Sequence, residues 1–141
     1  MYHYKILVPL LLGLFVVGLP LQAGADTLAP FTSDGCSAFP DGTLAQNELW
    51  LECCHAHDYA YWKGGTYSER LEADEALERC VAGVGEEAVA KLMLAGVRVG
   101  GSPYFPTAFR WGYGWPWSRG YQALSPSDWV QIRTYEERAG D

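Results

Sequence analysis

The sequence has few positive charges: 10 Lys and Arg stand against 17 Asp and Glu among 141 residues, so the formal net charge is −7. No block of consecutive basic residues occurs in it. Binding to nucleic acid rests on neutralising phosphates with Lys and Arg, and attraction to anionic lipid rests on the same charges. The composition therefore argues against nucleic acid as a partner, and contact with a lipid surface has to rely on aromatic side chains.

Two further features are missing. No internal repeat is visible, and no G-x-S-x-G motif occurs. The strained turn that presents a nucleophilic serine in many ester hydrolases is therefore not indicated. Nothing in the sequence indicates an oligomeric state.

One long apolar run is present, at the N-terminus. Residues 6–21 are almost wholly apolar, Lys5 precedes them, and small residues occupy 23–25. This pattern is typical of a signal peptide, and we predict one over residues 1–25. Its removal would leave a single domain, residues 26–141, with nine basic and 17 acidic residues and a net charge of −8. We expect this domain to be secreted or periplasmic, with an uncleaved membrane anchor as the alternative.

An exported protein meets an oxidising compartment, so the four cysteines, Cys36, Cys53, Cys54 and Cys80, are expected to form two disulfides. Adjacent side chains on a helix point about 100° apart. Cys53 and Cys54 must therefore have different partners, which ties their helix to the loop at Cys36 and to the later segment at Cys80. The spacing alone leaves two pairings open.

Capping signals and helical periodicity predict four helices and a mainly α fold. The predicted helices cover about residues 44–63, the segment from the Thr66 cap to about Val81, residues 86–99 and residues 125–138. The short Gly64-Gly65 connection favours an antiparallel arrangement of the first two. Residues 100–125 are rich in aromatics, Gly and Pro, and predict an ordered loop region with at most short strands.

The chemistry concentrates in CCHAHDYAY, residues 53–61. His57, Asp58 and Tyr61 share one face of the first predicted helix or its edge. Asp74 lies on the apolar face of the second helix, where a carboxylate needs a partner. A histidine that acts as a base needs one ring nitrogen held by an acceptor, so His57 is the natural partner. Asp58 then points toward the loop at Cys36, and a carboxylate facing backbone carbonyls suits Ca²⁺.

Two other interpretations of this segment are open. Cys and His bind zinc, but Cys53 and Cys54 diverge, and a disulfide-bonded cysteine is not a thiolate ligand. The alternative without function is a disulfide-linked helix whose histidines are exposed or satisfied in the core. We expect His55 to be exposed and without a role.

The segment resembles the C-C-x-x-H-D-x-C-Y signature of the secreted, calcium-dependent phospholipases A2. Asp74, followed six residues later by Cys80, resembles the second active-site helix of that family. The resemblance covers residues 34–81. Ala60 and Ala73 stand where the family has a bridged pair of cysteines, so both ends of one bridge are absent together.

The resemblance implies a residue assignment for catalysis. His57 would be the base that deprotonates water, Asp74 would orient it, Tyr61 would donate a hydrogen bond to Asp74, and Asp58 would bind Ca²⁺ through two oxygens. The disulfides that it implies are Cys36–Cys54 and Cys53–Cys80.

The resemblance also implies a calcium loop. By register from Cys36, the carbonyls of Gly35, Ser37 and Phe39 would be ligands, and the Ser37 amide would face the oxyanion. The family's loop is glycine-rich, whereas Pro40 and Asp41 occur here. Asp41 is therefore an alternative ligand.

The function implied is calcium-dependent hydrolysis of the sn-2 ester of phospholipids at a membrane interface. It would reside in a phospholipase A2-like domain, residues 26–141, with its core at 34–81 and an aromatic-rich extension at 100–141. The alternative is a catalytically silent lipid- or protein-binding module of the cell envelope. A third possibility is a purely structural envelope protein.

Overall fold

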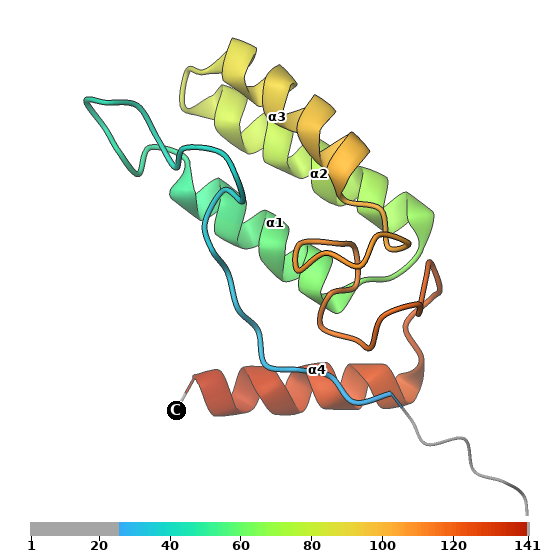
Figure 1. The fold of residues 1–141 in the computed structure, drawn as a ribbon. Helices are drawn as coiled ribbons and strands as arrows, with labels where there is room; N and C mark the ends of the chain where they lie inside the picture. The colour runs from blue at the N-terminus through green and yellow to red at the C-terminus, as the bar shows by residue number, and fades with distance from the viewer. Residues whose placement is uncertain (1–25, 141) are drawn as a thin grey trace, which may run out of the picture.

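A computed structural model describes residues 26–140 of the chain (Figure 1). Within this range the chain forms four helices and no strands: α1 (Leu51–Lys63), α2 (Tyr67–Gly83), α3 (Glu87–Gly100) and α4 (Pro126–Ala139). The predicted mainly α class is confirmed. The predicted signal peptide, residues 1–25, lies outside the described residues. Among the helices of residues 26–140, none has the length and apolar character to cross a membrane.

The turn between α1 and α2 follows from its sequence. Gly64 ends α1 with φ 66°, a conformation that favours glycine. Thr66 and Glu69 then form the predicted capping box at the start of α2. The Cys53–Cys80 disulfide joins the start of α1 to the end of α2. The two helices are therefore antiparallel, as predicted.

The start of α1 differs from the prediction, because residues 44–50 form turns instead of helix. Thr43 and Gln46 have the spacing of a capping box, and the Thr43 hydroxyl does accept a hydrogen bond from the Gln46 amide, at 3.0 Å. However, the Trp50 amide donates to the Asp41 carbonyl at 3.1 Å, and the Trp50 indole donates to Pro40 O at 2.7 Å. These contacts close residues 41–50 into a projecting loop before the helix begins (Figure 1).

Helix α3 packs along α2, and together with α1 and the Cys36 loop it encloses the first hydrophobic core. Its buried members are Cys36, Trp50, Cys53, Cys54, Leu77, Val81, Ala90 and Met93. Both disulfides, Cys36–Cys54 and Cys53–Cys80, lie at this core, and they are the pairs that the family resemblance implies.

Helix α4 belongs to a second core, built from Trp62, Trp115 and Ile132. It begins with a capping box at Ser125 and with Pro126 in its first turn, so a helix forms where residues 125–138 were predicted to be helical. The aromatic-rich segment before it has no regular structure within the described residues, and its aromatic side chains differ in exposure. Trp111 and Trp115 are buried. Tyr104, Phe105, Phe109 and Trp117 are exposed.

The two buried indoles of this segment fasten it to the α1–α2 turn. Trp111 Nε1 donates to Gly65 O at 2.9 Å, and Trp115 Nε1 donates to Lys63 O at 2.7 Å. The Lys63 carbonyl is one of those at the end of α1 that lack a partner within the helix, and the Gly65 carbonyl belongs to the turn that follows. Burial against a small core accounts for these two tryptophans.

Candidate functional site

The structure brings His57 and Asp74 together across the α1–α2 pair. His57 Nε2 lies 3.0 Å from Asp74 Oδ1, with 8% of the histidine and none of the aspartate exposed. The Cys53–Cys80 bridge fixes the register of the two helices, so residues on facing sides meet. The histidine is therefore held through one ring nitrogen. The other, Nδ1, makes no hydrogen bond within residues 26–140.

Tyr61, one turn beyond His57 on α1, donates a hydrogen bond to the same Asp74 oxygen at 2.6 Å. Burial, followed by the charge of Asp74, raises the pKa of Tyr61, so its hydroxyl stays protonated as a donor. The backbone of Gly101 passes directly against this hydroxyl, because a Cβ at that position would lie 2.4 Å from the Tyr61 oxygen. A glycine at position 101 thus leaves room for the Tyr61 hydroxyl.

Two arginines that the sequence did not suggest complete the surroundings of Asp74. Arg98 Nε, from α3, lies 2.9 Å from Asp74 Oδ2, and Arg70 Nε lies 3.9 Å from the same oxygen. Arg98 Nε and Asp74 Oδ2 make no hydrogen bond within the described chain, so their contact is an ion pair. Arg70 also donates to the Tyr61 hydroxyl at 3.2 Å. Arg70 precedes Asp74 by four residues, a helical spacing that could have revealed it.

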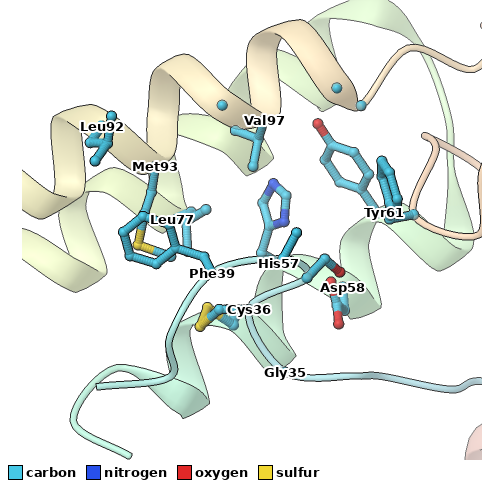
Figure 2. A pocket seen from close by; sticks show the side chains of 17 residues that line it. Gly35, Cys36, Phe39, His57, Asp58, Tyr61, Leu77, Leu92, Met93 and Val97 are labelled. Atoms are coloured by element: carbon cyan, nitrogen blue, oxygen red, sulfur yellow. A yellow bond between two sulfur atoms is a disulfide. The ribbon is translucent and has the colours of Figure 1, made fainter. Parts of the chain in front are cut away.

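A pocket of about 400 Å³ opens beside this cluster, between the Cys36 loop and α3 (Figure 2). His57 and Asp58 line it, and in Figure 2 the His57 ring lies between the loop and the α3 side chain Val97. The remaining walls are mostly apolar and include Leu77, Leu92, Met93, Val97 and Phe109. Such a cleft, with few polar groups on apolar walls, is typical of a small-molecule or lipid site.

The predicted loop ligands lie in the same pocket. Gly35, Ser37 and Phe39 line it together with Asp58. The three carbonyl oxygens of these loop residues accept no hydrogen bond within residues 26–140. Among the neighbouring carbonyls, those of Cys36, Pro40 and Asp41 accept hydrogen bonds, whereas that of Ala38 accepts none within the described residues. The three carbonyls that the resemblance implies as calcium ligands are thus among those left free.

The charge at Asp58 also fits a cation. Burial and the neighbouring Asp34 raise the pKa of Asp58, against the opposing effects of the Ser33 hydrogen bond and His57. Ser33 Oγ donates to Asp58 Oδ2 at 2.6 Å. No Lys or Arg of the described chain forms a salt bridge with this carboxylate. A half-buried carboxylate without a cationic side chain, in a pocket that is also lined by residues with free carbonyls, has the donor chemistry that Ca²⁺ prefers.

Asp41 and His55 do not line this pocket. Asp41 Oδ1 accepts a hydrogen bond from the Cys36 amide at 2.8 Å, inside the loop. One oxygen of the alternative ligand Asp41 is thus engaged within the loop. The side chain of His55 is 43% exposed, and its nearest acid is Glu52, at 4.0 Å.

The zinc hypothesis loses its sulfur ligands, because all four cysteines are in disulfides. Between residues 26 and 140, no group of three or more His, Cys, Asp or Glu side chains is placed to hold a metal. The predicted calcium ligands are a different set, one carboxylate and three backbone carbonyls.

Comparison with protein families, with curated proteins and with solved structures finds no match for this chain. Its function therefore has to be inferred from the residues of the pocket and their geometry.

Proposed function

We propose that this protein is an exported phospholipase A2 that hydrolyses the sn-2 ester of phospholipids in the presence of Ca²⁺. One observation carries the proposal: His57 is held at 3.0 Å by the fully buried Asp74 and lines an apolar pocket beside Asp58. The disulfides suit a secreted or periplasmic location.

His57 acts as the base in this mechanism. With Nε2–H donating to Asp74, the lone pair of Nδ1 is free to take a proton from a water molecule. Asp74 holds the ring in this tautomer and stabilises the imidazolium that forms. Tyr61 and Arg98 hold the Asp74 carboxylate in place through contacts of 2.6 and 2.9 Å.

The residues that would hold Ca²⁺ are Asp58, with its two carboxylate oxygens, and Gly35, Ser37 and Phe39, with their carbonyls. When bound there, the ion supplies positive charge that polarises the ester carbonyl and stabilises the oxyanion. A serine nucleophile is then not required, in keeping with the absence of a G-x-S-x-G motif.

The apolar walls of the pocket suit the acyl chain of a phospholipid. Leu92 and Phe109, which line the pocket, are also 60% and 44% exposed. Apolar side chains thus extend from the pocket to the protein surface. A protein of net charge −7 would approach a lipid surface through such side chains more than through charge.

Calcium binding tests the metal part of this proposal. We expect calorimetry to detect Ca²⁺ binding to the wild type, and Asp58→Asn to abolish it. Because the folded state raises the pKa of Asp58, its ionised form disfavours folding at neutral pH. Asp58→Asn should therefore raise the free energy of unfolding without calcium. The exposed carboxylate Glu48, outside the pocket, provides a control in Glu48→Gln. Equal calcium affinity in Asp58→Asn and the wild type would contradict the assignment.

A catalytically silent lipid- or protein-binding module is the second candidate. The observation in its favour is the loop, where Pro40 and Asp41 replace the glycine-rich sequence of the family and the Asp41 carboxylate is engaged by the Cys36 amide. A folded protein that binds phospholipid vesicles, but neither binds Ca²⁺ nor releases fatty acid, would establish this alternative.

A further inference from the structure

A second hollow of about 440 Å³ lies on the aromatic-rich segment, and the proposed hydrolysis does not use it. Thr107, Ala108 and Arg110 line this hollow, whereas Phe109 lines the catalytic pocket. Residues 107–110 are thus shared between the two pockets. Its other lining residues are Ala29, Pro30, Thr32, Pro106, Tyr113 and Trp117.

Arg110 is a buried cation without an acidic partner. It is 7% exposed, and its two terminal nitrogens donate to Gly112 O at 2.7 Å and Trp115 O at 2.6 Å. Its Nε makes no hydrogen bond, and no Asp or Glu of the described chain forms a salt bridge with it. Burial lowers the pKa of Arg110, the direction expected for an uncompensated guanidinium.

The other arginines that are buried or half-buried within residues 26–140 are all paired. Arg70 and Arg98 contact Asp74, and Arg119 pairs with Asp128. Carboxylates are abundant in this acidic chain, yet none between residues 26 and 140 forms a salt bridge with Arg110. A buried charge normally needs a partner of opposite sign, and residues 26–140 supply none for Arg110.

A second unpartnered group lies in the same hollow. Thr107 Oγ1 is buried and has no hydrogen-bond partner in the described chain. Buried hydroxyls are almost always hydrogen-bonded. A hydroxyl that needs an acceptor therefore occurs together with a guanidinium that needs an anion.

We propose that Arg110 and Thr107 form a binding site for an oxyanion, of which a phosphate group is the chemistry that we would test first. Arg110 Nε and the Thr107 hydroxyl would donate to its oxygens, and a charge-assisted hydrogen bond to a guanidinium is among the stronger ones. Negative charge that would repel an anion also lies nearby. Together with burial, which has the larger effect, the charges of Asp58 and Asp34 raise the pKa of the lining residue Tyr113. We therefore expect affinity in the millimolar range.

The direct test is calorimetric titration of the calcium-free protein with inorganic phosphate, against sodium chloride of the same ionic strength. Phosphate should bind and chloride should not. Thr107→Val, which keeps the shape of the side chain, and Arg110→Gln should each weaken binding at least about fivefold. Arg133→Gln, on the exposed face of α4, should leave it unchanged. If Arg110→Gln does not fold, Thr107→Val decides.

The source of the phosphate is resolved in a second set of measurements. Glycerol 3-phosphate and vesicles of phosphatidic acid represent a lipid headgroup, and vesicles of phosphatidylcholine provide the comparison. Preference for phosphatidic acid that is lost in Thr107→Val identifies a headgroup site. Binding of inorganic phosphate without such a preference identifies a site for the free ion.

This site is independent of the proposed hydrolysis, so the His57→Ala protein should bind phosphate as the wild type does. The proposal is overturned if phosphate binds no better than chloride, or if Thr107→Val binds it as tightly as Arg133→Gln does.

Discussion

At the scale of single residues, the site depends on how Asp74 is held. Its carboxylate is fully buried, and side chains from three helices contact it: His57, Tyr61, Arg98 and Arg70. A buried carboxylate with this many cationic and donor neighbours is balanced electrostatically. It can therefore hold the His57 ring in one orientation.

Tyr61→Phe tests this balance. The substitution removes the 2.6 Å hydrogen bond to Asp74 and the acceptor of Arg70, while the ring still fits. We expect the free energy of unfolding to fall by about 1.5–3 kcal/mol, because a buried charged group loses a donor. Fatty-acid release should fall about tenfold and persist, since the His57–Asp74 contact remains.

Tyr59→Phe provides the control for Tyr61→Phe. Tyr59 is on the same helix, and its hydroxyl donates to Glu136 at the protein surface. Its loss should change the free energy of unfolding by less than about 0.5 kcal/mol. Equal losses of unfolding free energy for the two substitutions in urea denaturation would show that the hydrogen bond from Tyr61 to Asp74 does not stabilise the fold more than the surface contact of Tyr59 does.

The sequence predicted His57, Asp74 and Tyr61 because their positions follow from helical spacing, and the family resemblance pairs the cysteines that set the helix register. It did not predict Arg98. This residue reaches Asp74 from α3, whose rotation against α2 is decided by packing. A local pattern carries no information about that rotation.

At the scale of elements, α2 and α4 were predicted well because their starts are encoded locally, in the Thr66 and Ser125 capping boxes. The first helix was predicted to begin too early. Its Thr43 capping hydrogen bond forms, but the contacts of Trp50 with residues 40 and 41 close a loop instead. Those contacts span about ten residues and depend on a buried indole, so local helix propensity could not reveal them.

The two disulfides act on different elements, which predicts different consequences of their removal. They close chain segments with sequence separations of 18 and 27 residues, so replacing either pair by alanine should cost roughly 3 kcal/mol of unfolding free energy. Only loss of Cys36–Cys54 frees the loop that carries the proposed calcium ligands. We therefore expect calorimetry to show weakened calcium binding in that variant alone. Equal weakening in both variants would contradict the assignment of residues 35–39.

Helix α4 should show a dependence on acid. Burial raises the pKa of Asp128, but hydrogen bonds from the Ser125 amide and from Arg119 outweigh it, so the pKa is lowered overall. A lowered pKa means that the ionised form stabilises the fold above the usual value of ~3.9. This stabilisation disappears as the pH falls through the folded-state pKa.

Asp128→Asn tests this dependence. At neutral pH it should lower the free energy of unfolding by about 1 kcal/mol, the typical effect of a lost cap. The difference from the wild type should shrink as the pH falls below the usual value and through the lowered folded-state pKa, because the wild-type carboxylate then becomes protonated as well. Glu137→Gln, exposed on the same helix, is the control. A gap that stays constant between neutral and acid pH would contradict a role for the ionised carboxylate.

At the scale of the whole molecule, the two hydrophobic cores have different structural roles. The first core supports the pocket through both disulfides, and the second fastens α4 and the aromatic-rich segment to the far end of α1. Helical patterns revealed the first arrangement. The second depends on indole hydrogen bonds to backbone carbonyls, Trp111 to Gly65 and Trp115 to Lys63. Composition alone could not assign those partners among so many aromatics.

The central claim is that this whole arrangement is a calcium-dependent lipid hydrolase with His57 as its base. The most direct measurement is fatty-acid release from mixed phospholipid vesicles by the oxidised protein, with Ca²⁺ and with a chelator, for the wild type, His57→Ala and His55→Ala. We expect release only with Ca²⁺, and a loss of at least about 10²-fold in His57→Ala. His55→Ala should release fatty acid at nearly the wild-type rate, because the His55 side chain is partly exposed and does not contact Asp74. Calcium-dependent release that is as fast in His57→Ala as in the wild type, or no release by the folded wild type, would contradict the account.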